Sequence, residues 1–368
     1  MQTRTNRQWI LKRRPEGMVD PSLFELVESP VPDLADRQIL AQTLYVSFDP
    51  TQRAWMAMDT YIPAVELGEP MRAAGIAQVI DSRHPKFKAG DLINYLCGWQ
   101  EYIVIDPDER GFVPVTKMPA HIDPALLLAL SLTGLTAYFG LLDVGRPKHD
   151  DTVLISGAAG ATGSVAGQIA KLKGCRVIGI AGGPEKCNWL TQTAEFDAAI
   201  DYKNESVGER LTALCPDGVD VYFDNVGGEM LDEVLMHLAL NARIVICGAI
   251  SQYNNPNDMY GIRNYVSLII RRATAQGFII LDYMDRAVEG LLCLNKWIED
   301  GKIIQEIDMQ HGFEEIPKTL TRLFTGKNLG KQLLKVTDPP LPIRSNVIEV
   351  AVFRVLSAYM VWRKGYSP

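Results

Sequence analysis

The sequence predicts an α/β protein in which a doubly wound parallel sheet is joined to a second, β-rich domain. Strand-like and helix-like segments alternate through the middle of the chain, which is typical of a parallel sheet covered by helices on both faces. The N-terminal third is instead rich in proline, glycine and short β-type runs. A chain of 368 residues is long enough for two domains with separate cores.

The β-rich domain is expected over residues 1–126, with residues 309–336 returning to complete it. Its strand candidates are "DRQILAQTLYVSFDP", "AAGIAQVIDS", "GDLINYL" and "WQEYIVID". Trp99 beside one of these strands is expected to fill the core.

The parallel sheet is expected over residues 127–308. Asp123-Pro124 begins a helical stretch that ends at Gly145, and strand candidates then alternate with helical segments. The candidates are "TVLISGA", "CRVIGIA", "AAIDY", "VDVYFDNV" and "ARIVICGAI", with "ATAQGFII" as an edge strand.

Residues 337–368 form an extension to which the sequence assigns no function. Its run "VIEVAVFRVLSAYMVW" contains Glu349 and Arg354 and is shorter than the roughly twenty apolar residues that span a bilayer. A partner-packed or poorly ordered segment is therefore expected rather than a membrane span.

Composition and charge exclude several classes of function. The net charge of −7 argues against a nucleic-acid-binding surface, which needs clustered positive charge. The six cysteines contain no CxxC pair and the five histidines are isolated, so we expect no metal site. The N-terminus has no apolar core typical of a signal peptide, and a cytoplasmic location is expected.

The segment "VLISGAAGATGSVAGQIAK" has the pattern of a dinucleotide site. A buried strand leads into a turn containing Gly157, Gly160 and Gly163, and a helix follows. Glycines at such a junction let backbone N–H groups approach a pyrophosphate at the positive end of the helix.

The next strand indicates which dinucleotide is bound. NAD sites usually place an acidic residue at its end, but here the chain reads "AGGPEK". Gly182 leaves room for a 2′-phosphate, Lys186 supplies positive charge, and Tyr202 offers a hydroxyl, so the sequence predicts NADPH. The alternative is that Lys186 only begins a solvated helix face.

Several motifs together resemble one protein family. "AAGATGSVAGQIAK", "AGGPEKC", "YFDNVGG", "ICGAISQYN" and "GKNLGKQLLKV" are similar to the medium-chain dehydrogenase/reductase superfamily. More narrowly they resemble its zinc-independent leukotriene/prostaglandin reductase and alkenal double-bond reductase branch. "LYVSFDP", "MRAAGIAQVI" and "GDLINYLCGWQEYIV" extend the resemblance over about residues 5–336. It implies a Rossmann sheet, a GroES-like β-rich domain and a homodimer.

The resemblance also implies where the cofactor lies. The residues along the pyrophosphate would be Ala161, Thr162, Gly163 and Ser164, and Lys186 and Tyr202 would hold the 2′-phosphate. The path from the adenosine ribose to the nicotinamide would be lined by Asn225, Cys247, Gly248, Ala249, Ile250 and Ser251. The nicotinamide end would be closed by Phe278, Ile279, Ile280 and Asn328.

The expected chemistry is reduction of the C=C bond of a small enal or enone. The stretch "MRAAGIAQV" stands where zinc alcohol dehydrogenases carry "GHE", and it offers no metal ligand. Hydride addition to the β-carbon of an enone leaves negative charge on the carbonyl oxygen, and one hydrogen-bond donor can stabilise it. Tyr253 is the candidate donor, supported by the resemblance, and a purely packing tyrosine is the alternative.

Two residues are expected near the substrate. Tyr61 lies in a loop and either lines the pocket or packs, and Thr51 stands in "SFDPTQR" where many relatives read "SVDPYMR". That difference leaves the substrate preference open. The rival functions are an NADPH quinone reductase and a non-catalytic NADPH-binding regulator.

Overall fold

The computed structural model describes residues 4–109, 111–255, 258–344 and 347–364. Contacts divide the chain into two compact units. Unit 1 contains Met1–Ala129, Ile307–Asn328 and Gln332–Val352, and unit 2 contains Leu130–Glu306, Leu329–Lys331 and Phe353–Pro368. The contacts thus place the unit boundaries at 129/130 and 306/307, and they divide the predicted extension at 352/353. Positions 345–346 and 365–368 of that extension lie outside the described residues.

Unit 1 is built on an antiparallel sheet in the order β14-β15-β3-β4-β5-β7, with β6 paired to β3. Its strands are β3 (Ile39–Ser47), β4 (Gly75–Ser82), β5 (Leu92–Tyr95), β6 (Tyr102–Ile105), β7 (Thr116–Lys117), β14 (Ile307–His311) and β15 (Lys331–Lys335). Because β15 pairs with β3, the chain returns to this sheet after unit 2.

A two-stranded ribbon and short helices complete unit 1. The elements are β1 (Thr5–Leu11), β2 (Phe24–Pro30), α1 (Gln52–Ala57), α2 (Pro124–Ala129), α10 (Ile316–Phe324) and the 3₁₀ turns Pro21–Leu23 and Phe313–Glu315. Trp99 is fully buried, with its ring centroid 4.6 Å from that of Phe24 and 5.9 Å from that of Phe48. The core role predicted for Trp99 is therefore confirmed.

Unit 2 is a six-stranded sheet in the order β10-β9-β8-β11-β12-β13, and every neighbouring pair is parallel. Its strands are β8 (Thr152–Ser156), β9 (Arg176–Ala181), β10 (Ala198–Asp201), β11 (Val219–Asp224), β12 (Leu238–Ile246) and β13 (Thr274–Gly277). This order confirms the doubly wound Rossmann sheet, with β13 at its edge as predicted.

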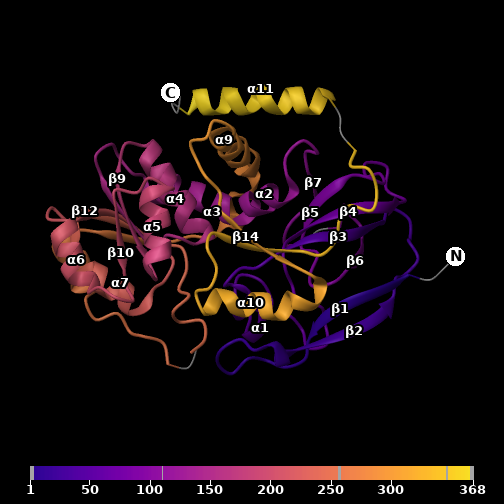
Figure 1. Ribbon diagram of the computed structural model, residues 1–368, viewed down its shortest axis with the longest axis horizontal. Coiled ribbons are helices and arrows are strands. Elements are labelled where there is room, and N and C mark those ends of the chain that lie inside the picture. Colours follow the sequence, from indigo (N-terminus) through magenta and orange to yellow (C-terminus); the bar gives the residue numbers. More distant parts are fainter. Residues whose placement is uncertain (1–3, 110, 256–257, 345–346, 365–368) are drawn as a thin grey trace. The chain divides into compact units, whose positions relative to one another are not determined.

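Helices cover both faces of this sheet (Figure 1). The helical elements of unit 2 are η2 (Leu130–Gly134), α3 (Leu135–Phe139), η3 (Gly140–Gly145), α4 (Ala161–Leu172), α5 (Pro184–Gln192), α6 (Val207–Leu214), α7 (Gly228–Leu235), α8 (Val266–Arg271), η4 (Ile280–Arg286) and α9 (Ala287–Glu299), together with the part of α11 (Val347–Arg363) from Phe353 onward. The apolar side chains of α6 and α7 pack into one core with alternate residues of the strands, such as Leu154 and Ile178.

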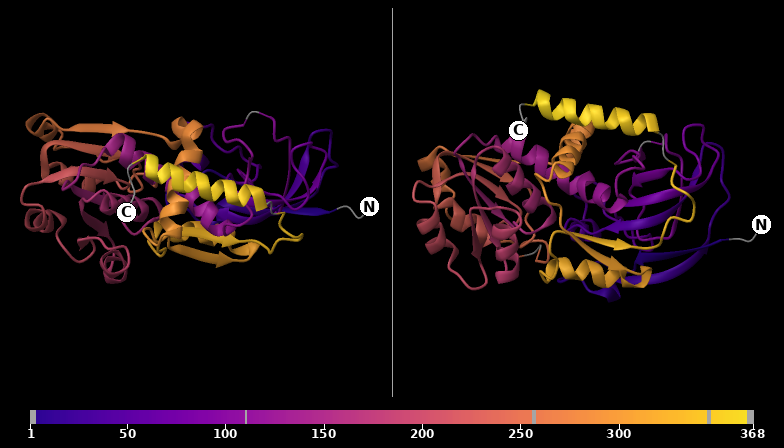
Figure 2. Two further views of the ribbon diagram at one scale, coloured as in Figure 1. Left: turned by 90° about the horizontal axis from the view of Figure 1, so that it is seen from above. Right: turned by 45° about the horizontal axis from the view of Figure 1, so that its top comes forward.

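Two helices bear on the question of a membrane span. Among the described helices, residues 124–145 are long and apolar enough to cross a bilayer, but 72% of their most apolar window is buried inside the protein, as in a core helix. From Phe353 onward α11 belongs to unit 2 and lies across α9, and Lys364 forms an ion pair with Glu289 at 2.7 Å (Figure 2).

Candidate functional site

The glycine-rich turn after β8 brings the start of α4 close to the end of the strand. Gly157 has a φ of 59°, in the left-handed region that favours glycine, and its carbonyl accepts from the N–H of Gly160 at 3.0 Å. A Cβ on Gly163 would lie 2.5 Å from that same carbonyl oxygen. The first N–H groups of α4 have no acceptor within the helix, so this end of α4 can receive a pyrophosphate.

The residues implied along the pyrophosphate differ in their exposure. Ala161 and Thr162 are partly exposed, whereas Gly163 and Ser164 are buried. The Ser164 hydroxyl has no hydrogen-bond partner among the described residues and is covered by the unit. A pyrophosphate at this turn would therefore meet backbone groups rather than the Ser164 side chain.

A second segment lies beside the turn. The N–H of Gly330 donates to the carbonyl of Ala159 at 2.8 Å, and Gly330 forms a parallel bridge with Gly160. Asn328, which the resemblance implies for the nicotinamide end, precedes this segment by two residues and is half-buried.

Gly182 stands where an NAD site would carry an acidic residue. Two side chains that follow β10 lie over it. A Cβ on Gly182 would lie 2.9 Å from Cε1 of Tyr202 and 2.9 Å from Cε of Lys203. Tyr202, predicted from the sequence to hold the 2′-phosphate, therefore lies beside Gly182, and Lys203 is a neighbouring cation that the sequence reading overlooked. Lys203 could have been found from the sequence, because it directly follows Tyr202 in "IDYK". Lys186 lies half-buried in the first turn of α5, which begins just beyond Gly183.

The acidic side chain at the end of β10, Asp201, binds backbone groups of this turn. Asp201 accepts from the N–H of Gly183 at 2.7 Å, from the N–H of Lys203 at 3.1 Å and from the Asn204 amide at 2.7 Å. The Gly183 bond is the largest of the effects that hold the pKa of Asp201 below its usual range. Asp201 therefore shapes the turn that carries Gly182.

Hydrogen bonds join the ends of the neighbouring strands β8 and β11. Between these two strands the order of the sheet reverses. The fully buried carboxylate of Asp224 accepts from the Ser156 hydroxyl at 2.9 Å and the Tyr222 hydroxyl at 2.8 Å. Asn225 donates through its N–H to the Ser156 hydroxyl oxygen and through its side chain to the Ser156 carbonyl, at 2.9 and 2.7 Å. Ligands of such sheets bind at this reversal point. The sequence reading missed Asp224, although it stands within "FDNVGG".

The segment from Cys247 to Tyr253 packs against the residues after β11. The N–H groups of Cys247 and Gly248 donate to the Asp224 carbonyl at 2.9 and 3.1 Å, and the Ser251 hydroxyl donates to Val226 at 2.7 Å. Ile250 donates its N–H to the Asn225 carbonyl at 3.3 Å. Burial raises the pKa of the Cys247 thiol to about 12, so this cysteine is a neutral packing group.

The candidate donor lies on this same segment. The Tyr253 hydroxyl accepts from the N–H of Ala249 at 3.2 Å, which places its oxygen on the stretch implied to follow the cofactor. A Cβ on Gly227 would lie 3.1 Å from Cβ of Ala249, and a Cβ on Gly228 would lie 2.4 Å from Nε2 of Gln252. The two glycines of "FDNVGG" therefore allow the segment from Cys247 to Tyr253 to pack closely against the residues after β11.

The residues implied at the nicotinamide end are half-buried. Phe278 packs its ring against the helix at Gly140, where a Cβ would lie 2.4 Å from Cζ of the ring, and it meets Tyr283 edge-on at 6.2 Å. Ile279 and Ile280 follow it at the start of η4.

The two predicted substrate residues meet in unit 1. The hydroxyl oxygens of Thr51 and Tyr61 are 3.0 Å apart, and Tyr61 is 46% exposed. The Tyr61 ring meets Trp55 edge-on at 6.4 Å.

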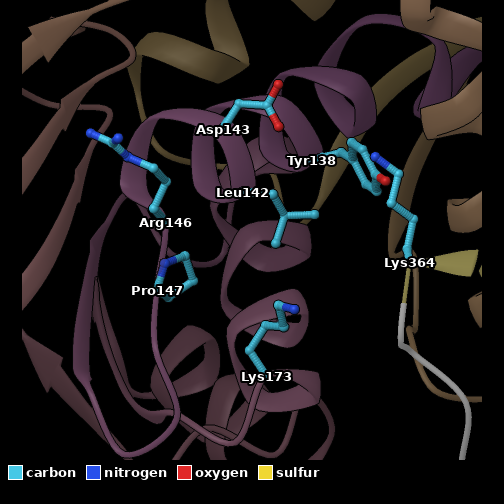
Figure 3. A pocket seen from close by; sticks show the side chains of 7 residues that line it. All are labelled: Tyr138, Leu142, Asp143, Arg146, Pro147, Lys173 and Lys364. Carbon is cyan, nitrogen blue, oxygen red and sulfur yellow. The ribbon is translucent and has the colours of Figure 1, made fainter.

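Unit 2 also contains a cavity of about 240 Å³ (Figure 3). Arg146, Lys173 and Lys364 line it together with Tyr138 and Asp143. Arg146 precedes β8 and Lys173 follows α4, whereas the turn joins the other end of β8 to the start of α4. This cavity is therefore distinct from the candidate site.

One group of potential metal ligands occurs among the described residues. His84, Asp106 and Asp108 have ligand atoms within 4.8 Å of one another. Asp108 also accepts from the guanidinium of Arg37, which already supplies the positive charge at this surface. The hydrogen bond with His84, followed by the contact with Arg37, holds the pKa of Asp108 below its usual range.

Comparison with known proteins connects this geometry to a family. Residues 7–114 match the "N-terminal domain of oxidoreductase" family, and residues 161–293 match the "Zinc-binding dehydrogenase" family. The chain is 45% identical over 343 residues to the putative NADP-dependent oxidoreductase YfmJ of Bacillus subtilis, covering 92% of this chain and 99% of that protein. It is 37% identical over 341 residues to the NADP(+)-dependent 2-alkenal reductase of Nicotiana tabacum, covering 90% and 98%.

A solved structure agrees with these relatives. CurA of Vibrio vulnificus in complex with NADPH is 39% identical, covers 90% of this chain and 100% of that chain, and superposes with a TM-score of 0.84. The chain therefore belongs, as predicted, to the medium-chain dehydrogenase/reductase superfamily, in its leukotriene/prostaglandin reductase and alkenal double-bond reductase branch.

Proposed function

We propose that this chain uses NADPH to reduce the C=C bond of α,β-unsaturated aldehydes or ketones. The observation that carries the proposal is the Tyr253 hydroxyl, which lies 3.2 Å from the Ala249 N–H on the segment expected to follow the cofactor. The relative named as a 2-alkenal reductase supports the substrate class.

The residues of unit 2 fit an NADPH molecule. Gly163 lets the start of α4 pack directly on the backbone of the turn, because a Cβ there would collide with the Gly157 carbonyl, and the first N–H groups of α4 suit a pyrophosphate. Tyr202 and Lys203 lie over Gly182, where an acid would repel a 2′-phosphate, and Lys186 lies in the first turn of α5 just beyond it. The complex of the similar CurA with NADPH supports this assignment.

The chemistry asks for one well-placed donor. Bound in this site, the reduced nicotinamide supplies the hydride that the β-carbon of the substrate accepts. Negative charge then accumulates on the carbonyl oxygen, and Tyr253 donates a hydrogen bond to that oxygen. The α-carbon takes its proton from solvent, so no dedicated acid is required. The stretch 71–79 offers no metal ligand, and we propose a zinc-independent reaction.

We propose further that the protein is a homodimer paired along β13. This strand is the sheet edge opposite β10, and its four residues are exposed. On the neighbouring helix α8, Ile269 and Ile270 are 72% and 63% exposed. Exposed edges and apolar surface of this kind are commonly covered by a second copy. The cytoplasmic location stays a prediction.

The test is a panel of enals, enones and quinones, assayed by the loss of NADPH absorbance. Turnover of enals and enones supports the proposal. Turnover of quinones alone would favour the rival quinone reductase. Tight NADPH binding without turnover of any member would indicate a non-catalytic regulator.

A further inference from the structure

Helix α11 is attached to unit 2 along one side. The residues of α11 that belong to unit 2 begin at Phe353. Ser357 and Val361, which lie one helical turn apart, are buried. Lys364, on the same side of the helix, pairs with Glu289 of α9 at 2.7 Å (Figure 2). This side of α11 therefore faces the protein.

The opposite side of α11 exposes large apolar side chains. These side chains are between 44% and 67% exposed and belong to Val355, Leu356, Tyr359 and Trp362. Their spacing places them within one sector of the helix, which we call the α11 outer face. The ring centroids of Tyr359 and Trp362 lie 6.0 Å apart, so the two rings form one aromatic surface. A helix that is apolar all round is normally covered on every side, whereas this face is open to solvent.

The charge of this part of the chain is opposite in sign to that of the whole protein. Residues 350–364 contain Arg354, Arg363 and Lys364 and no acidic residue, whereas the net charge of the protein is −7. Lys364 is already paired within unit 2. Arg354 and Arg363 are exposed, and neither has an acidic partner among the described residues. Each directly adjoins a residue of the α11 outer face in the sequence, so two uncompensated positive charges border that face.

An anionic phospholipid surface fits these features better than a second copy of this chain does. Tyrosine and tryptophan rings prefer the boundary between headgroups and acyl chains, because each ring has an apolar body and a polar group. Arginine side chains beside them can reach the headgroup phosphates. Two α11 outer faces packed together would instead place positive charge on both sides of the contact. With 17 residues α11 is shorter than a bilayer span, so it would lie along the surface.

We propose that the α11 outer face binds the surface of membranes that contain anionic phospholipids. Its four apolar side chains enter the headgroup boundary, and Arg354 and Arg363 bind the lipid phosphates. The opposite side of the helix stays attached to unit 2, so the protein is held at the surface without a membrane span. This contact uses none of the residues assigned to NADPH or to the substrate, and it is independent of the proposed reaction.

The experiment measures co-sedimentation of the full-length protein with lipid vesicles. Vesicles of phosphatidylcholine and phosphatidylglycerol should bind the wild-type protein, and vesicles of phosphatidylcholine alone should bind it at least about tenfold less. Arg363→Gln should lower the partition coefficient for the anionic vesicles roughly fivefold, which is the effect of one cation near a charged surface. Val355→Glu should lower it further, because it places an acid on the α11 outer face.

Two variants outside α11 are the matched controls. Leu240→Glu replaces an apolar residue of β12 that is 51% exposed, and Lys148→Gln removes an exposed cation before β8. Both should bind the anionic vesicles as the wild-type protein does. Thermal unfolding followed by circular dichroism shows whether each variant is folded.

The tryptophan fluorescence of the wild-type protein is a second measurement. It should shift to shorter wavelength with anionic vesicles, and Trp362→Phe should abolish the shift. Should Val355→Glu fail to fold, Arg363→Gln and this fluorescence shift decide the matter.

Three results would overturn the proposal. The first is equal binding of the wild-type protein to both kinds of vesicle, or binding to neither. The second is a partition coefficient that Arg363→Gln and Val355→Glu leave unchanged or that the controls lower equally. The third is dissociation of the lipid-free protein into single chains by Val355→Glu, which would assign the α11 outer face to a second copy.

Discussion

The hydroxyl oxygen of Tyr253 accepts a hydrogen bond from the backbone N–H of Ala249, with the two atoms 3.2 Å apart. A hydroxyl that accepts in this way still carries a proton to donate. The bond also holds the tyrosine to the segment that begins at Cys247, which is itself fastened to the end of β11. The candidate donor is therefore positioned by the sheet through two successive contacts.

Tyr253→Phe should lower kcat by on the order of a hundred- to a thousandfold, because the variant keeps the ring but deletes the donor to the developing oxyanion. The dissociation constant for NADPH should change little. Single-turnover kinetics together with NADPH titration measures both effects. Tyr265→Phe is the matched control, since it deletes the hydroxyl of a tyrosine that is 60% exposed. A purely packing role for Tyr253 would leave kcat near the wild-type value.

Lys186→Ala should raise the KM for NADPH roughly ten- to a hundredfold, because it removes a charge-assisted contact with the 2′-phosphate. The KM for NADH, which lacks that phosphate, should stay nearly constant and serves as the internal control. Steady-state kinetics with both cofactors checks the prediction. Equal changes for the two cofactors would show that Lys186 only begins a solvated helix face.

Lys203→Gln should also weaken NADPH selectively, by roughly two- to fivefold, because an exposed cation contributes less than a half-buried one. The prediction follows from the position of its Cε over Gly182. Lys148→Gln, at an exposed lysine just before β8, is the matched control for loss of one positive charge. The measurement is again the ratio of NADPH to NADH KM values, and an unchanged ratio would remove Lys203 from the site.

Light scattering at micromolar concentration should give about twice the chain mass of 40.9 kDa. Ile269→Glu, beside the edge strand β13, should shift the protein toward the monomer. Val355→Glu is the control, because that residue is 67% exposed on α11 and lies outside the proposed interface. A wild-type mass near that of one chain would contradict the homodimer.

Local patterns were sufficient to predict the parallel sheet and the glycine-rich turn. Gly157, Gly160 and Gly163 act within one strand–turn–helix unit, so their spacing alone carries the information. The edge position of β13 followed from its place at the end of the alternating series. The helix at 124–145 was also predicted. Its π-helical turns over Leu130–Gly134 and Gly140–Gly145 were not, because we find no feature of the sequence that indicates them.

Contacts between distant segments could not be predicted in the same way. Lys203 lies over Gly182 only because β10 pairs with β9 in one particular register. The Ser164 hydroxyl, implied along the pyrophosphate, is buried without a hydrogen-bond partner among the described residues, which the residue type alone does not indicate.

The product formed from a simple conjugated enone distinguishes reduction of the C=C bond from reduction of the carbonyl group. The experiment uses NADPH carrying deuterium at the transferable position, with and without a metal chelator. We expect a saturated ketone with deuterium on the β-carbon, formed at the same rate in both conditions. An allylic alcohol, with deuterium on the former carbonyl carbon, would contradict the proposed reduction of the C=C bond.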